Sequence, residues 1–376
     1  MSDTDNKPQV APAPDIAAPP APSPAPAVGT RAAPLPVDLG LQGGGSHGAF
    51  TWGVLDRLLE EERLEIDAIS GASAGAMNAA ALVAGYQEGG RAGAKAALER
   101  FWGTVGRAAT LSPLRRGPLD ILLGRWTLDS SPAFIIMDLM ARVVSPYDFN
   151  LTGTNPLESV LAETIDFDRL AHAEQRLYVT ATNVHTGRGR VFRNAEVTPH
   201  VLMASACLPT LFQAVEIDGE HYWDGGYAGN PTITPLVRDG GRADDLILIA
   251  INPVERPGTP RTAAEIQNRL NEISFNAATI KELRGIALLQ QLLATLDVRP
   301  DQKRSEAERW ASFRVHIVSS PMMIDLGHSS KLNAEWAFLT HLRDEGRRCA
   351  EAFLAEKGDA IGTRSTVDLA KLLEGV

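Results

Sequence analysis

Ser73 lies within Gly71-Ala72-Ser73-Ala74-Gly75, which matches the pattern G-x-S-x-G. In a sharp turn between a strand and a helix, the serine of this pattern is pushed out of the chain, and the glycines remove side chains that would collide with neighbouring backbone. The N-terminus of the following helix also favours the negative charge that builds up during acyl transfer. The pattern therefore predicts Ser73 as a nucleophile, with a simple tight turn as the alternative.

The glycine run Gly43-Gly44-Gly45 has two interpretations. Together with Gly48 it fits the dinucleotide fingerprint G-x-G-x-x-G, whereas the run alone could offer backbone N–H groups to an oxyanion. A dinucleotide site needs an acidic residue about 20 positions further on, at the carboxyl end of the next strand, to hold a ribose. Asp67 has about this spacing but lies at the beginning of that predicted strand. The position therefore favours an oxyanion hole over a nucleotide-binding module.

Asp224 is the candidate base for Ser73. Asp224-Gly225-Gly226 follows a predicted strand, and paired glycines permit a tight turn that could bring the carboxylate to the site. An ordinary aspartate, with a pKa of about 3.9, is a weak base, so we expect a shielded environment that raises this pKa. A triad of Ser73, Asp224 and His328, in the chain order of the α/β-hydrolases, is the alternative.

Two strand-turn-helix units would position these residues. Residues 36–42 and 66–70 are predicted strands, and residues 49–64 and 74–86 are the predicted helices that follow them. Such units form a parallel sheet with crossover helices, and the turns after both strands then emerge at the same edge. We therefore expect the glycine run to lie beside Ser73.

The rest of the chain continues this alternation. Further strands are predicted at 176–183, 188–192, 212–217, 220–223, 246–252 and 313–319, and further helices at 89–105, 197–206 and 331–356. Asp218-Gly219 predicts the turn of a hairpin. Residues 106–156 show no clear period, which indicates an irregular insertion. This insertion is either a lid or acyl-chain wall over the site, or a surface insertion with its own small core.

Residues 261–297 are predicted to be helical, because apolar residues recur at steps of three and four. These residues are Ile266, Leu270, Ile273, Ile280, Leu283, Leu288, Leu292 and Leu296. We expect this stripe to pack on its own domain. The alternative is a helix that binds a membrane surface or a partner, which would suit a scaffold protein.

Composition limits the compartment and the partners. Residues 1–36 hold ten of the 24 prolines amid Ala and Ser, which predicts a disordered tail. The sequence shows no Sec signal peptide and no membrane-spanning segment, and a net charge of −10 argues against nucleic-acid binding. Cys207 and Cys349 form no disulfide framework, which fits a reducing compartment. We expect a cytoplasmic protein.

No metal or cofactor is needed for the predicted chemistry. Asp166 with Asp168, and Asp218 with His221, match neither a calcium loop nor a zinc spacing. We interpret these four as surface residues.

The three glycine-flanked segments, in this order, resemble the patatin-like phospholipase family over residues 37 to about 255. The resemblance implies an α/β fold with three layers, in which the sheet carries helices on both faces, and a Ser-Asp dyad in place of a triad. Ser73 would be the nucleophile and Asp224 the base acting directly on its hydroxyl. The amides of Gly43, Gly44 and Gly45 would form the oxyanion hole. The substrate would be a lipid or another acyl ester, reached with peripheral membrane contact.

Further motif residues support this resemblance. They are His47, Gly48, Gly71, Gly75, Gly225 and Gly226. Residues 204–209 and Asn230-Pro231 also fall where family members carry a small-residue helix and an Asn-x-Pro-like turn. The family commonly has Arg or Lys at the position of His47, and a neutral imidazole supplies less fixed positive charge near the oxyanion.

These predictions divide the chain into four segments. A tail covers 1–36, and a catalytic domain with the insertion 106–156 covers 37–257. A helical insertion covers 258–310, and a C-terminal strand and helix at 311–376 complete the domain.

Overall fold

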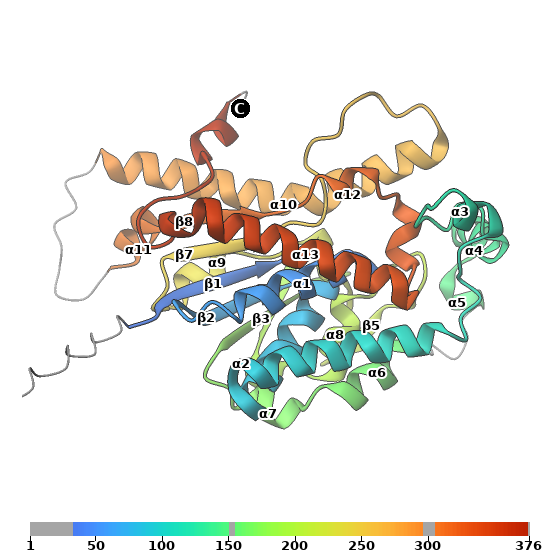
Figure 1. Cartoon of the computed structure of the whole chain (residues 1–376), viewed down its shortest axis with the longest axis horizontal. Helices are drawn as coiled ribbons and strands as arrows, with labels where there is room; N and C mark the ends of the chain where they lie inside the picture. Colours follow the sequence, from blue (N-terminus) through green and yellow to red (C-terminus); the bar gives the residue numbers. More distant parts are fainter. Residues whose placement is uncertain (1–32, 150–154, 296–304, 375–376) are drawn as a thin grey trace, which may run out of the picture. The chain divides into compact units, whose positions relative to one another are not determined.

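One mixed sheet carries the segments that the sequence singles out (Figure 1). The computed structural model describes residues 33–149, 155–295 and 305–374. Within these residues eight strands form one sheet in the order β5-β6-β3-β2-β1-β7-β8, with β4 paired to β3. The strands are β1 (Leu35–Leu41), β2 (Leu64–Gly71), β3 (Arg176–Asn183), β4 (Gly189–Arg193), β5 (Val215–Ile217), β6 (Glu220–Asp224), β7 (Asp245–Ile249) and β8 (Arg314–Val318).

The middle of the sheet is parallel, as predicted. β1 pairs in parallel with β2 on one side and with β7 on the other. β2 in turn pairs in parallel with β3, and β7 pairs in parallel with β8. These strands are covered on both faces, which is why β7 reads as the uninterrupted apolar run Leu246 to Ile249. Leu41 lies opposite Gly71 at the carboxyl ends of β1 and β2. The glycine turn and the Ser73 turn therefore leave the sheet side by side.

The other part of the sheet is antiparallel and contains the predicted hairpin. β5 and β6 pair around Asp218 and Gly219, both of which have positive φ, as a tight two-residue hairpin turn requires. β6 also pairs with β3, where Asp224 lies opposite Ala181. Val179, two residues earlier in β3, lies opposite the last residue of β2. Asp224 is therefore placed just beyond the end of β2.

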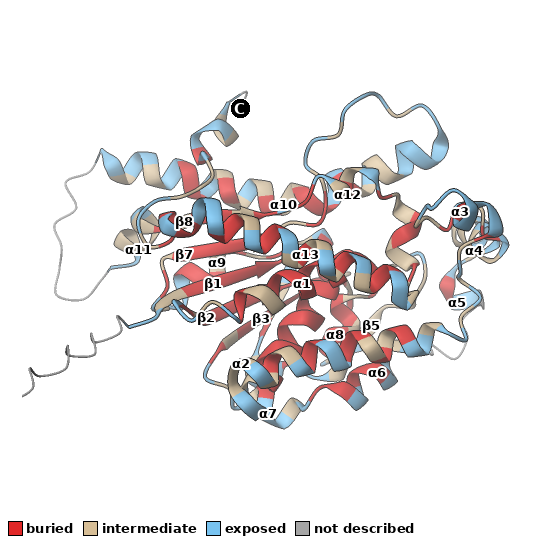
Figure 2. Cartoon of the chain, in the orientation of Figure 1, coloured by how far each residue is buried: buried red, intermediate tan, exposed pale blue. Residues whose placement is uncertain are grey.

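Helices cover both faces of the sheet and confirm the predicted three-layer α/β fold. One apolar core joins Leu39 and Ile69 to helices α1, α2 and α13, and a second joins Leu246 and Leu248 to α9 and α10. Figure 2 shows the buried strands between these layers. The helices are α1 (Gly48–Leu58), α2 (Ala74–Ala109), α3 (Pro118–Leu122), α4 (Pro132–Val143), α5 (Pro146–Phe149), α6 (Leu157–Thr164), α7 (Phe167–Ala171), α8 (Pro199–Ser205), α9 (Thr234–Arg238), α10 (Ala263–Ala294), α11 (Glu306–Ser312), α12 (Met322–Asp325) and α13 (Trp336–Lys357).

Several boundaries differ from the predicted ones. α1 ends at Leu58, six residues early, because the chain turns and Leu64 already belongs to β2. α2 spans both predicted helices, but Gly89 and Gly90 have non-helical dihedral angles, so the predicted break is present as a kink. The insertion 106–156, predicted as irregular, contains the short helices α3, α4 and α5. Residues 150–154 lie outside the described part of the chain.

The predicted packing of the helix after residue 261 is wrong for most of its apolar stripe. In α10, Ile266, Leu270, Ile273, Leu288 and Leu292 are exposed, whereas Leu283 is buried. The helix is buried instead along the face that carries Glu272, Phe275, Asn276, Thr279, Leu283, Ile286 and Ala287. The C-terminal half of this face packs into the second apolar core through Leu283, Ile286 and Ala287. In the N-terminal half, Asn276 and Thr279 hydrogen-bond to loops at the sheet edge, as described below. Leu296 lies outside the described residues.

The described residues from Pro34 onward belong to one compact unit. Residues 1–32 of the predicted tail lie outside the described residues, and β1 begins at Leu35, one residue before the predicted strand. Among the residues that the structure describes, no helix is long and apolar enough to span a membrane.

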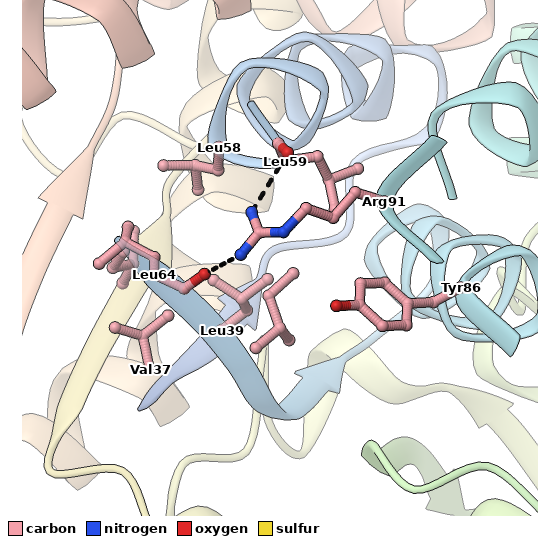
Figure 3. Close-up of a pocket in the computed structure, with 9 residues that line it drawn as sticks. Val37, Leu39, Leu58, Leu59, Leu64, Tyr86 and Arg91 are labelled. Carbon is pink, nitrogen blue, oxygen red and sulfur yellow. Dashed lines mark hydrogen bonds between the residues drawn. The ribbon is translucent and has the colours of Figure 1, made fainter. Parts of the chain in front are cut away.

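A small cavity lies between β1, β2, the C-terminal end of α1 and the kinked middle of α2 (Figure 3). Val37 and Leu64 line it at the N-terminal halves of their strands, far from the Ser73 turn along β2. The Arg91 guanidinium reaches in from α2 and donates to the carbonyls of Leu59 and Leu64. A volume of about 10 Å³ has room for one water molecule, so this cavity cannot hold an acyl chain.

Candidate active site

Ser73 occupies a strained turn between β2 and α2. Its φ of 52° and ψ of −127° are unusual for a residue with a side chain, and such strain persists where the surrounding structure enforces it. The residue precedes the first turn of α2, yet its hydroxyl makes no capping hydrogen bond to that helix. Its amide instead donates a 2.9 Å hydrogen bond to Oγ of Ser205. The hydroxyl is therefore left for another partner.

The neighbouring glycines are required by close backbone contacts. A methyl group at Gly75 would collide with the carbonyl of Leu41 at the end of β1. At Gly43 it would lie 2.6 Å from both Cβ of Ser73 and the carbonyl oxygen of Ala72. The glycine run therefore packs directly against the serine turn, as predicted from the parallel order of β1 and β2.

Asp224 lies at the end of β6 and is 1% exposed. Its Oδ1 accepts a 2.7 Å hydrogen bond from the amide of Gly226, which the tight Asp-Gly-Gly turn brings back to the carboxylate. Burial raises the pKa of Asp224 to about 6, while the Gly226 amide, a hydrogen bond from the Ser73 side chain and the charge of Lys331 act in the opposite direction. The structure thus brings Ser73 and Asp224 into contact, and it supplies the shielded environment expected for a weak base.

The amides of the glycine run are used in different ways. Gly43 donates its N–H to Oδ1 of Asn230 at 2.6 Å, and Nδ2 of Asn230 lies 3.3 Å from the Gly43 carbonyl oxygen. The amides of Gly44, Gly45 and Ala74 have no hydrogen-bond partner among the described residues. Asn230 therefore fixes the loop through Gly43, and the unpaired amides beside the serine turn are those of the next two glycines and of the first residue of α2.

His47 is buried beside the glycine run and is uncharged. Burial lowers its pKa well below the usual value, and the charges of Lys331 and His328 add to this effect. Its Nε2 lies 2.7 Å from Oγ of Ser330, and its ring packs edge-on against Phe338. The glycine turn therefore contributes no side-chain charge of its own.

Neither alternative site is assembled in the structure. His328 pairs with Nδ2 of Asn271 at 3.1 Å, and in the described residues it has no hydrogen bond to Ser73 or Asp224. Burial lowers its pKa to about 4.

Asp67, the acidic residue that the dinucleotide alternative requires, is held in ion pairs away from the glycine run. Asp67 forms ion pairs with Arg176 at 2.7 Å and Arg242 at 3.2 Å. Within the described residues, no group of three or more His, Cys, Asp or Glu side chains is arranged to hold a metal ion.

Sequence reasoning missed several side chains that hold the site. Ser205 donates 2.7 Å to the carbonyl of Thr180, and its oxygen receives the Ser73 amide. Gln42, directly before the glycines, accepts from the amides of Ile251 and Asn252 at 2.9 and 3.0 Å. Ser205 lies in the small-residue segment 204–209, but nothing in its local spacing indicates its partners.

The buried face of α10 contacts the same region. Phe275 fills the space beside Gly226, where a methyl group would collide with its ring. Asn276 donates to the carbonyls of Asn252 and Pro253, and Thr279 donates 2.7 Å to the carbonyl of Asn230. The helix therefore supports the loops around Asp224 and Gly43, which explains its buried polar face.

Comparisons with known proteins define the family. A family model described as "Patatin-like phospholipase" matches residues 39–237, just over half of the chain and the segment that contains the glycine run, Ser73 and Asp224. The chain belongs to the patatin-like phospholipase family. It is accordingly a hydrolase that acts on the ester bonds of lipids.

Structural comparison gives a distant match. The crystal structure of VipD from Legionella pneumophila is 16% identical and aligns over 84% of this chain and 67% of that chain, with a TM-score of 0.34. A search of the curated proteins gives no match.

Proposed function

We propose that this lipid acyl hydrolase works through a Ser-Asp dyad, with Ser73 as nucleophile and Asp224 as its base. The observation that supports the proposal is the contact between the two side chains: the Ser73 hydroxyl, which makes no capping hydrogen bond to α2, donates to a buried carboxylate whose pKa is raised to about 6. A base with a pKa near the working pH combines the correct protonation state with sufficient basicity.

The reaction proceeds in two steps. Asp224 takes the hydroxyl proton as the Ser73 oxygen attacks the ester carbonyl, and the protonated carboxyl then gives that proton to the departing alcohol. The resulting acyl-enzyme is cleaved by water, whose proton goes to Asp224. The serine oxygen takes this proton back as the fatty acid leaves.

The glycine run supplies the oxyanion hole of this mechanism. The amides of Gly44, Gly45 and Ala74 are suited to the developing negative charge, since they have no other partner among the described residues. The Gly43 amide is occupied by Asn230, so Gly43 contributes by holding the loop in position. The N-terminus of α2 adds a favourable dipole at the same place.

We further propose that the protein contacts a phospholipid surface through the α3–α4 apolar surface, formed by Leu119, Ile121, Leu122, Ile135, Ile136 and Leu139. None of the residues of α4 is buried, and Ile136 and Leu139 are 63% and 61% exposed (Figure 2). The insertion is tied to the segment beside the site, because the Leu128 amide donates 3.0 Å to Ser329. A lipid hydrolase must reach substrates held in a bilayer, and exposed apolar helices serve this purpose.

The dyad is tested with purified variants on a soluble short-chain ester and on phospholipid vesicles. We expect Ser73→Ala and Asp224→Ala to lose activity by about 1,000-fold or more and His328→Ala to retain it. Loss of activity in His328→Ala with a folded protein would instead support the triad.

The membrane contact is tested by sedimentation with phosphatidylcholine vesicles. We expect Ile136→Gln/Leu139→Gln to reduce binding while leaving hydrolysis of the soluble ester unchanged. Leu288→Gln/Leu292→Gln, which replaces two exposed leucines near the C-terminal end of α10, is the matched control and should bind as the wild type does. Equal loss in both variants would contradict a specific role of the α3–α4 apolar surface.

A further inference from the structure

Lys331 lies against the glycine run although it comes from the C-terminal part of the chain, outside residues 39–237. It belongs to the 3-10 turn His328–Leu332, which packs on the turn Gly45–His47. A methyl group at Gly45 would collide with the carbonyl of Lys331. The side chain of the preceding residue, Ser330, is hydrogen-bonded to the His47 ring. This segment therefore closes directly over the proposed oxyanion loop.

The Lys331 side chain is connected to that loop by hydrogen bonds. Its Nζ donates 2.8 Å to Oδ1 of Asn252. Nδ2 of Asn252 in turn donates 2.9 Å to the carbonyl oxygen of Gly43. The ammonium also lies 5.8 Å from the centre of the Phe275 ring, which packs on the Asp224 turn. A single residue therefore separates Lys331 from each half of the site: Asn252 links it to the Gly43 loop, and Phe275 lies between it and the Asp224 turn.

The charge of Lys331 acts on the carboxylate of Asp224. Five charged or titratable groups from the elements around it interact with this lysine: Asp224, Glu272, Arg256, His47 and His328. Burial lowers the pKa of Lys331 to about 8, while Glu272 and Asp224 raise it and Arg256 lowers it further. Both His47 and His328 have lowered pKa values and are neutral at pH 7. Lys331 is therefore the cation whose charge acts on Asp224.

We propose that Lys331 is an electrostatic and positioning residue of the hydrolase: its ammonium supplies the positive charge that the glycine turn lacks, and it holds the Gly43 loop through Asn252. This inference rests on the proposed Ser-Asp dyad. A nearby cation stabilises the ionised form of Asp224, which is the form that accepts the proton of Ser73. It also favours the oxyanion, whose negative charge develops beside the same loop.

The two contributions can be separated by substitution. Lys331→Met removes both the charge and the hydrogen bond to Asn252. Lys331→Gln removes the charge but retains an N–H donor, and Lys331→Arg retains a charge that does not titrate below pH 12. The matched control is Lys281→Met, which removes an exposed lysine from α10.

The experiment measures kcat, KM and their pH dependence on a soluble ester, with thermal unfolding as a check of folding. We expect kcat of Lys331→Met and Lys331→Gln to fall on the order of tenfold to a hundredfold, with a small change in KM. The acidic limb of kcat/KM should move to higher pH in both variants, because the pKa of Asp224 rises when the cation is lost. Lys331→Arg should return this limb toward the wild-type position, and Lys281→Met should leave every parameter unchanged.

Each result discriminates. A wild-type acidic limb and wild-type kcat in folded Lys331→Gln would overturn the proposal. If kcat falls in Lys331→Met and Lys331→Gln but the acidic limb of kcat/KM does not move, the role of Lys331 is purely structural. This result would also overturn the proposal. If the wild type shows no activity that depends on Ser73, then the dyad itself fails, which the Ser73→Ala control reports separately.

Discussion

The amide of Ser73 donates a 2.9 Å hydrogen bond to Oγ of Ser205, and that hydroxyl donates 2.7 Å to the carbonyl of Thr180 in β3. Ser205 is fully buried at the end of α8. One hydroxyl therefore links the turn after β2 to the neighbouring strand and holds the strained backbone of Ser73 in place.

Removal of this hydroxyl should weaken both the fold and the activity. Ser205→Ala leaves the buried Ser73 amide without its partner, which costs about 1–3 kcal/mol of unfolding free energy. We expect kcat to fall by roughly tenfold, since a poorly held nucleophile loses its alignment. Urea unfolding and ester hydrolysis measure the two effects. Ser159→Ala, at an exposed position of α6, is the control, and equal behaviour of the two variants would show that the link is unimportant.

The pH dependence of the reaction should follow Asp224. Burial raises the pKa of this carboxyl to about 6, and only the ionised form accepts a proton from Ser73. Activity should therefore be full well above pH 6 and fall as the pH drops through about 6. The same loss of kcat/KM at low pH should be seen in His328→Ala. A kcat/KM that stays constant down to pH 4.5 would argue against a base in this environment.

The glycine at position 75 should not tolerate a side chain. A methyl group there collides with the Leu41 carbonyl, so Gly75→Ala must push the glycine run away from Ser73. We expect loss of activity and a lower melting temperature. Gly285→Ala, also within a helix, meets no atom within 4 Å and should gain up to about 1 kcal/mol of stability from helix propensity. Similar effects of both substitutions would contradict the steric explanation.

Asp38 should be replaceable by asparagine with a gain in stability. Both carboxylate oxygens are buried without a side-chain hydrogen-bond donor among the described residues, and Arg176, 3.9 Å away, and the Ala68 amide offset only part of the effect of burial. Burial raises the pKa of Asp38 well above its usual value, so the unfolded chain ionises first and wild-type stability falls as the pH rises above about 4.

Urea unfolding at pH 5 and pH 8 tests this effect. Asp38→Asn has no charge to bury, so its unfolding free energy should exceed that of the wild type at pH 8, by about 1–3 kcal/mol, and the difference should shrink at pH 5. Lower stability of the variant at both pH values would indicate instead that Asp38 is ionised and paired with Arg176.

The parallel part of the sheet and the positions of the turns that carry Ser73 and Asp224 could be predicted because their signals are local. Gly43, Gly71 and Gly75 are needed where backbones approach closely, and such positions leave glycines in the sequence at fixed distances from Ser73. The repeated strand-turn-helix pattern then determines that the two turns share one edge. The Asp224 turn follows from a hairpin whose Asp218-Gly219 bend is equally local.

The supporting side chains could not be predicted because their partners are remote. Asn252 and Asn276 hydrogen-bond to Gly43 and Gln42, which lie more than 200 residues away in the sequence, and Lys331 reaches the site through Asn252. No spacing rule connects residues at such separations. The apolar stripe of α10 predicted the wrong buried face of this helix for a related reason. The buried face of this helix combines apolar packing of Leu283 and Ile286 with hydrogen bonds from Asn276 and Thr279 to loops at the sheet edge, and hydrophobic periodicity does not register the hydrogen bonds.

The dyad is tested most directly by labelling the protein with a fluorophosphonate, followed by peptide mass spectrometry. We predict that the phosphonyl group is found on Ser73, that labelling is as fast in His328→Ala as in the wild type, and that it is slowed strongly in Asp224→Asn. Modification of a different serine, or labelling of Ser73 at the wild-type rate in folded Asp224→Asn, would contradict the account.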